Sequence, residues 1–163
     1  MHFRCIPFSA LSLPQLYDIL QLRAQVFVVE QNCPYLDLDG KDEAAHHLLC
    51  YDTIATQTGV SSVLVAYCRL LPPHIAYPDY SDISIGRVVS SPLVRGKGAG
   101  QRLMKEAIRR LPLLFADSYG RVPLCRIGAQ AYLQAFYEGF GFAATGKKYL
   151  EDNIPHIEMT GNF

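Results

Sequence analysis

The chain has 163 residues, a formal net charge of zero and a hydrophobic fraction of 50%. This length is typical of one folded domain with its own core, and the composition excludes an intrinsically disordered chain. A net charge of zero argues against a protein that binds nucleic acid through a broad basic face. No apolar run is long enough to cross a membrane, and residues 1–12 lack the apolar stretch of a signal peptide. We therefore expect a single domain over residues 1–163, located in the cytoplasm.

The cysteines favour free thiols over a disulfide framework, because their number is odd and their spacing is long and irregular. They are Cys5, Cys33, Cys50, Cys68 and Cys125. No C-x-x-C pair is present, so the sequence predicts no metal site. Free thiols are typical of a reducing compartment, which agrees with the cytoplasmic expectation.

The N-terminal part predicts a strand followed by a helix. Residues 3–8 can form the first strand. Ser12 and Gln15 then have the spacing of a capping box, with Pro14 in the first turn, where proline is tolerated. Apolar residues follow at helical spacing as far as Phe27. We expect this helix to end near residues 30–32, before Pro34.

An acidic turn and a pair of strands are expected next. Residues 36–43 hold three aspartates around Gly40, without the ligand pattern of a calcium loop. Residues 45–51 and 60–70 then have the character of antiparallel strands joined around Thr58-Gly59.

The C-terminal half alternates strands and helices. Strands are expected at residues 83–89, 124–129, 142–149 and 156–160, and helices at residues 98–111 and 131–138. The whole order predicts an α/β layered fold: a mixed, mostly antiparallel central sheet of about seven strands, flanked by helices. The apolar run at residues 111–115 is either core or the interface of a homodimer.

The segment before the helix at residues 98–111 is rich in glycine and basic residues. It reads Arg95-Gly96-Lys97-Gly98-Ala99-Gly100. It is not a Walker loop, because no Gly-Lys-Ser/Thr closes it, and the wider dinucleotide fingerprint is absent. Glycines allow a ligand to approach the backbone closely, and a helix start offers unpaired N–H groups to anions. The segment therefore predicts a phosphate or pyrophosphate site.

The pattern Arg95-x-x-Gly98-x-Gly100, between a strand and a helix, resembles the acetyl-coenzyme A signature of the GCN5-related N-acetyltransferases (GNAT superfamily). The resemblance implies acetyl-CoA as donor substrate, and an enzyme that passes the acetyl group directly to an amine. The donor-binding residues that it implies are Val88, Val89, Ser90, Arg95, Gly96, Lys97, Gly98, Ala99, Gly100, Gln130 and Phe136.

A second segment, Phe136-Tyr137-Glu138-Gly139-Phe140-Gly141-Phe142, resembles the end of the same family's motif. Tyr137 falls where the family carries its general acid. A tyrosine hydroxyl near the sulfur could protonate the thiolate that leaves when an amine attacks a thioester. The alternative is a tyrosine that packs in the core with its hydroxyl in water. Where the family usually carries asparagine, this chain has Gln130.

Residues 22–35, 37–48 and 153–159 resemble the ElaA-like branch of these acetyltransferases. The bases considered for the acceptor amine are Glu30, His47 and Glu158, directly or through water. Arg23, Arg87 and His156 are expected to contact the acceptor, an amine-bearing small molecule or peptide that the resemblance does not identify. The alternative function is a non-catalytic module that binds coenzyme A or another protein on the same fold.

Overall fold

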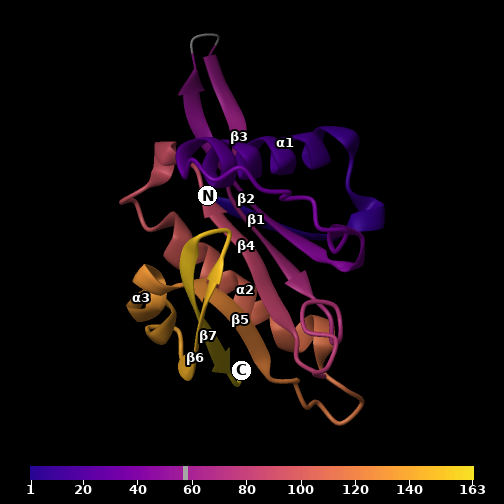
Figure 1. Ribbon diagram of the computed structural model, residues 1–163. Coiled ribbons are helices and arrows are strands. Elements are labelled where there is room, and N and C mark those ends of the chain that lie inside the picture. Colours follow the sequence, from indigo (N-terminus) through magenta and orange to yellow (C-terminus); the bar gives the residue numbers. More distant parts are fainter. Residues whose placement is uncertain (57–58) are drawn as a thin grey trace.

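The computed structural model describes residues 1–56 and 59–163, and the strands of this part form two antiparallel sheets (Figure 1). The first sheet has the order β1-β2-β3-β4, with β1 (His2–Pro7), β2 (His46–Thr56), β3 (Gly59–Leu71) and β4 (Ser84–Ser90). The second has the order β5-β7-β6, with β5 (Cys125–Gln130), β6 (Ala143–Glu151) and β7 (Ile154–Gly161). The predicted fold class is confirmed. Of the expected β2–β3 turn, Thr58 lies outside the described residues.

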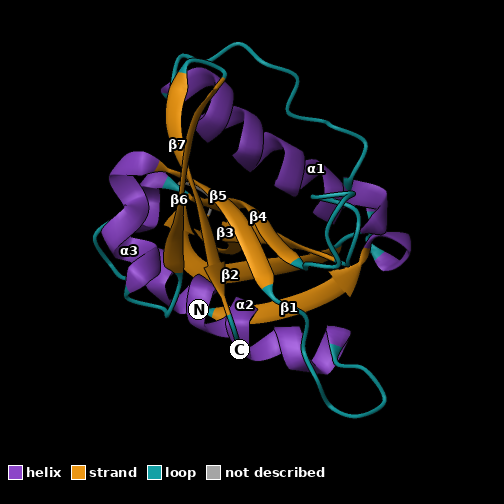
Figure 2. Cartoon of the chain, turned by 60° about the horizontal axis from the view of Figure 1, so that its bottom comes forward, coloured by secondary structure: helices purple, strands orange, loops and turns teal. Residues whose placement is uncertain are grey.

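Helices cover both faces of the strands (Figure 2). They are α1 (Leu13–Arg23), α2 (Ala99–Phe115) and the short α3 (Gln134–Glu138). Because side chains alternate across a strand, the two faces bury different residues. Leu103 and Met104 of α2 pack in one core with Leu48 and Cys68, while Ile19 of α1 packs in a second core.

The start of α1 follows the predicted capping box. The Ser12 N–H donates to Gln15 Oε1 at 3.0 Å, and the Gln15 N–H donates to Ser12 Oγ at 3.3 Å. The helix also runs as far as expected, but its last part, Ala24–Glu30, is a π-helix. Such a widened turn is rare and is found mostly at functional sites. Its last residue, Glu30, pairs with Arg95 in the segment that follows β4.

The two sheets meet at one parallel bridge, between Ile83 and Cys125. There the Ile83 N–H donates to the Leu124 carbonyl at 3.0 Å, and the Arg126 N–H donates to the Ile83 carbonyl at 2.9 Å. Beyond this bridge β4 and β5 belong to separate sheets. The divergence of these two strands leaves one edge of β4 without a partner strand among the described residues.

The apolar run at residues 111–115 belongs mostly to the core. Leu111 is fully buried, and Leu114 and Phe115 are partly buried against the core that α2 covers. Pro112 and Leu113 are the exposed members of the run. No helix in the described residues is both long enough and apolar enough to span a membrane.

Candidate active site

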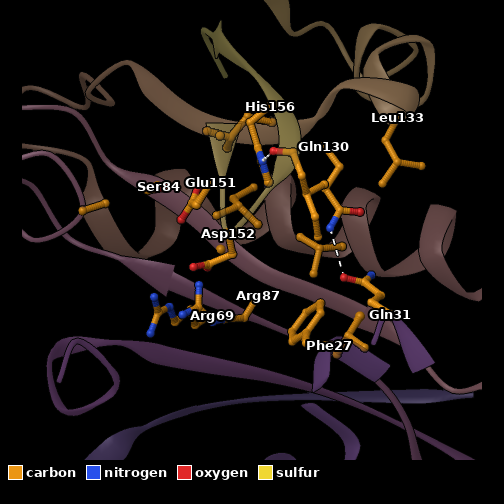
Figure 3. Close-up of a pocket in the computed structure, with 18 of the residues that line it drawn as sticks. Phe27, Gln31, Arg69, Ser84, Arg87, Gln130, Leu133, Glu151, Asp152 and His156 are labelled. Carbon is orange, nitrogen blue, oxygen red and sulfur yellow. Dashed lines mark hydrogen bonds between the residues drawn. The ribbon is translucent and has the colours of Figure 1, made fainter. Parts of the chain in front are cut away.

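A cleft of about 960 Å³ opens where β4 and β5 diverge. One wall comes from the π-helical turn and the end of β4, and the other from β5, β6 and β7. Figure 3 shows Phe27, Gln31 and Arg87 on one side of this cleft and Gln130 and His156 on the other. A hydrogen bond of 3.2 Å from Gln130 Nε2 to Gln31 Oε1 joins the two walls.

The unpaired edge of β4 runs along the cleft, where Val88, Val89 and Ser90 all line the cavity. A β-bulge precedes this edge, because Tyr67 pairs with Val89 whereas Arg69 pairs with Gly86. The extra residue of the bulge is Arg87, with φ of +53°. A bulge of this kind re-aims the backbone groups of a strand, here toward the cleft.

The glycine-rich loop continues directly from this edge. Gly96 and Gly98 have φ of +72° and +75°, which favours glycine at both positions. The first helical hydrogen bond of α2 is from the Arg102 N–H to the Gly98 carbonyl, at 3.0 Å. The N–H groups of residues 98–101 are therefore free of acceptors within the described part of the chain. Arg95 lines the cleft itself, whereas residues 96–100 lie just past its lining.

Arg95 and Glu30 form a bidentate ion pair at the mouth of the cleft, with one of its bonds, Nη2 to Oε2, at 2.9 Å. The hydrogen bonds from Arg95 hold the pKa of the Glu30 carboxyl below its ordinary value. Arg95, which was predicted to bind phosphate, and Glu30, which was considered as a base, thus neutralise each other's charge. Their ion pair links the glycine-rich loop to the π-helical turn.

Tyr137, on α3, is buried and lines the cleft. Burial raises the pKa of its hydroxyl, so the group keeps its proton at neutral pH. Phe136 packs edge-on against it at 5.1 Å between ring centroids. A side chain at Gly100 would meet the Phe136 ring at 3.8 Å, so α3 lies against the start of α2. The two motifs predicted to serve the same ligand are therefore neighbours in the fold.

Glu158 lines the cleft from β7 and is buried. It accepts from Arg126 Nη1 at 2.7 Å, from Thr145 Oγ1 at 3.1 Å and from Lys147 Nζ at 3.4 Å. Burial alone would raise the pKa of this carboxyl, but these three donors outweigh burial and lower the pKa.

His47 lies outside the cleft lining, within the described residues, on β2. Its Nε2 is 3.0 Å from the Asp42 carbonyl and its Nδ1 is 2.8 Å from the Tyr67 hydroxyl. A carbonyl can only accept, so Nε2 carries the proton and Nδ1 accepts from Tyr67. Both ring nitrogens are occupied, which leaves no lone pair for an acceptor amine.

The acidic turn is held by a network of three arginines, instead of being an isolated surface turn. Arg23 donates to Asp37 at 2.8 Å and to Asp42 at 2.9 Å. Arg69 pairs with Asp39 and Asp42, and Arg87 Nε donates to Asp37 at 2.6 Å. The network ties the turn to α1, β3 and β4.

Arg23 and Arg87, both expected to contact the acceptor, belong to this network. Arg23 is fully buried and lies outside the cleft lining among the described residues, so the prediction that it contacts the acceptor does not match its position. Arg87 does line the cleft. Its pair with Asp37 also braces the β4 bulge.

The comparisons with known proteins agree with this geometry. A family model described as "Acetyltransferase (GNAT) domain" matches residues 45–163. The chain belongs to the GNAT acetyltransferase family. Protein ElaA of Escherichia coli is 42% identical over 153 residues, which cover 93% of this chain and 90% of ElaA.

Two solved structures resemble this GNAT chain over 99% of its length. An acyl-CoA N-acyltransferase from Pseudomonas aeruginosa has a TM-score of 0.83 at 40% identity, with 99% of that chain covered. Escherichia coli ElaA has a TM-score of 0.81 at 38% identity, with 100% of that chain covered. Family membership and these neighbours support an acyltransferase enzyme.

The GNAT cleft contains side chains that the sequence analysis did not single out. Tyr77, Lys147 and Tyr149 all line it. Lys147 and Tyr149 are two residues apart on β6, so the alternation of a strand would have placed them on one face. Tyr77 lies in the loop before β4, where no periodic pattern operates. In the described part of the chain, no group of three or more His, Cys, Asp or Glu is arranged to hold a metal ion.

Proposed function

We propose that this chain transfers an acetyl group from acetyl-CoA to an amine by direct attack. The observation that carries the proposal is the unpaired edge of β4, which leads directly into a glycine loop with free N–H groups. An extended, amide-containing ligand that ends in a pyrophosphate suits this combination. Its amides can pair with the strand edge, and its phosphates can accept from the loop and the start of α2.

The donor site follows from this arrangement. Val88 and Ser90 pair with the pantetheine amides as a neighbouring strand would. The free backbone N–H groups of residues 98–101 donate to the pyrophosphate, and Arg95 and Lys97 add positive charge. Phe136 and Gln130 flank the arm that lies between the diverging strands. Arg95 exchanges part of its pairing with Glu30 for the phosphate.

The chemical step needs an oxyanion donor and an acid. A backbone N–H of the bulged β4 edge donates to the thioester carbonyl oxygen, where negative charge develops as the amine attacks. The Tyr137 hydroxyl protonates the departing thiolate. Because burial raises the pKa of Tyr137, the hydroxyl is fully protonated before the step and the phenolate regains a proton readily afterwards.

The competing function is a module that binds coenzyme A without transfer. Intact donor residues and a cleft that extends beyond them, to Tyr77, Tyr149 and Glu158, favour the enzyme, because a binding module needs no second site.

Two measurements test the proposal. Isothermal titration with acetyl-CoA, coenzyme A and ADP separates thioester recognition from general phosphate binding, and we expect acetyl-CoA and coenzyme A to bind more tightly than ADP. A thiol-release screen over amines, polyamines, amino acids and peptides then tests transfer. Tight acetyl-CoA binding with no thiol release from any acceptor would favour the module.

A further inference from the structure

The imidazole of His156, on β7, has a fixed tautomer. Its Nδ1 lies 2.8 Å from the carbonyl oxygen of Ile154. A carbonyl oxygen can only accept, so Nδ1 carries the proton in the neutral ring. The lone pair is then on Nε2. Within the described residues Nε2 has no hydrogen-bond partner, and His156 lines the cleft (Figure 3).

The ring is also held in place from the side. It stacks on Tyr149 of β6, with 5.7 Å between ring centroids and 23° between ring planes. Tyr149 in turn reaches over β5, where its hydroxyl would lie 2.2 Å from a Cβ built at Gly128. The absence of a side chain at Gly128 thus makes room for Tyr149, which supports the imidazole. A base that is pre-positioned in this way loses little entropy when it acts.

The other candidate bases are engaged elsewhere. Glu30 is committed to Arg95, and both ring nitrogens of His47 are occupied away from the cleft. Glu158 lies in the cleft, but its carboxylate accepts from Arg126, Thr145 and Lys147. His156 is the candidate that combines a place in the cleft with an unoccupied lone pair.

We propose that Nε2 of His156 is the general base that removes the proton from the acceptor amine. The assignment rests on the proposed function. Nε2 takes one proton from the acceptor ammonium, which frees the nitrogen lone pair that bonds to the thioester carbon, and the nitrogen loses its next proton to solvent as the amide forms. The carbon–sulfur bond then breaks with its electron pair on sulfur, which takes the proton of Tyr137. The imidazolium and the phenolate return to their starting forms by proton exchange through solvent, so no other reactant is needed.

Several titratable, charged or polar groups surround the imidazole. The titratable, charged or polar groups on the elements around it are Tyr149 and Lys147 on β6, Gln130 on β5, Glu158 on β7, Tyr77, and Glu151 and Asp152 at the β6–β7 turn. Burial raises the pKa of Tyr149 to about 12, and the pKa of Glu158 is lowered. Neither of these two groups therefore changes charge near neutral pH.

The test compares the wild-type chain with His156→Gln. Glutamine keeps a polar side chain at this position but cannot act as a base. His74→Gln is the matched control, because His74 makes the same kind of bond, from Nδ1 to the Pro78 carbonyl at 3.2 Å, outside the cleft lining of the described residues. Acetyl-CoA is the donor, and thiol release is followed. The two probe acceptors are glycinamide, whose amine resembles an α-amino group of pKa about 8, and Nα-acetyl-lysinamide, of pKa about 10.4.

We expect His156→Gln to lower kcat by about 100-fold at neutral pH, the usual contribution of a general base. The loss should be larger for the lysine amine, and it should shrink toward high pH, where solution supplies the free amine. Affinity for acetyl-CoA by titration should be unchanged. An unchanged kcat, or a loss that is equal for both amines and independent of pH, overturns the assignment and leaves the proposed function standing. If the wild-type chain uses neither probe, the same comparison is made with an amine that the thiol-release screen finds. Absence of thiol release with all amines of the screen contradicts the proposed function, and the assignment falls with it.

Discussion

Asp37 is the centre of the arginine network, and its removal is predicted to destabilise the fold strongly. Its carboxylate accepts from Arg23 Nε at 2.8 Å, Arg87 Nε at 2.6 Å and the Tyr35 hydroxyl at 2.9 Å. Asp37 is 6% exposed and Arg23 is fully buried. Asp37→Ala therefore leaves a buried guanidinium with part of its charge uncompensated.

The size of this effect follows from the partners that remain. Breaking a buried ion pair by removing one member costs about 3–5 kcal/mol. Arg23 keeps its bond to Asp42 at 2.9 Å, so the lower end of that range applies. With a urea m-value of roughly 2 kcal/mol/M, a loss of about 3 kcal/mol lowers the unfolding midpoint by about 1.5 M.

Urea unfolding followed by circular dichroism measures this midpoint. The control is Asp117→Ala, because Asp117 pairs with Arg121 at 2.9 Å on the surface, where an ion pair contributes little. We expect the control to unfold close to the wild type. An Asp37→Ala midpoint equal to that of the wild type would refute the view that the network holds the turn to α1 and β4.

Three further predictions concern the donor site and the dependence of stability on pH. Tyr137→Phe should lower kcat by at least about 100-fold while the affinity for acetyl-CoA stays the same, and an unchanged kcat would remove the acid role. Gly98→Glu should abolish acetyl-CoA binding in titration, because a carboxylate enters the anion site. The control Gly120→Glu, at a similar φ of +77°, should bind acetyl-CoA normally. Normal affinity of the Gly98 variant for acetyl-CoA would contradict the loop assignment. Burial lowers the pKa of His47 against the opposing effect of the hydrogen bond to the Asp42 carbonyl, so the neutral ring stabilises the folded state. The contribution of the neutral His47 ring to the free energy of unfolding should be complete above about pH 6.5 and should decline as the pH falls below that value. His47→Asn should make this decline less steep. An equal dependence of the free energy of unfolding on pH in wild type and variant would count against a buried neutral ring.

Local chemistry explains which parts of the molecule could be predicted from sequence. The capping box at Ser12 and the glycine loop depend on residues a few positions apart, so their signals are complete within a short window. Tyr137 was singled out through the family resemblance of the segment around it, and in the structure it lines the cleft.

Other features depend on backbone geometry or on contacts between residues far apart in the chain, which local sequence patterns do not report. The π-helical turn has the same apolar spacing as an α-helix, so periodicity could not separate the two forms. The pairing of Arg23, Arg69 and Arg87 with the acidic turn joins residues up to 50 positions apart. The tautomer of His156 depends on the backbone at the β6–β7 turn, which placed the Ile154 carbonyl against Nδ1.

The central claim is that acetyl-CoA lies along the free edge of β4 with its pyrophosphate at the glycine loop. Hydrogen–deuterium exchange of the full chain with and without coenzyme A tests this most directly, because it reads backbone N–H groups. The account predicts slower exchange on binding in peptides that cover Val88–Ser90 and residues 96–101, with no change in β1. Slower exchange elsewhere, with these two segments unchanged, would contradict it.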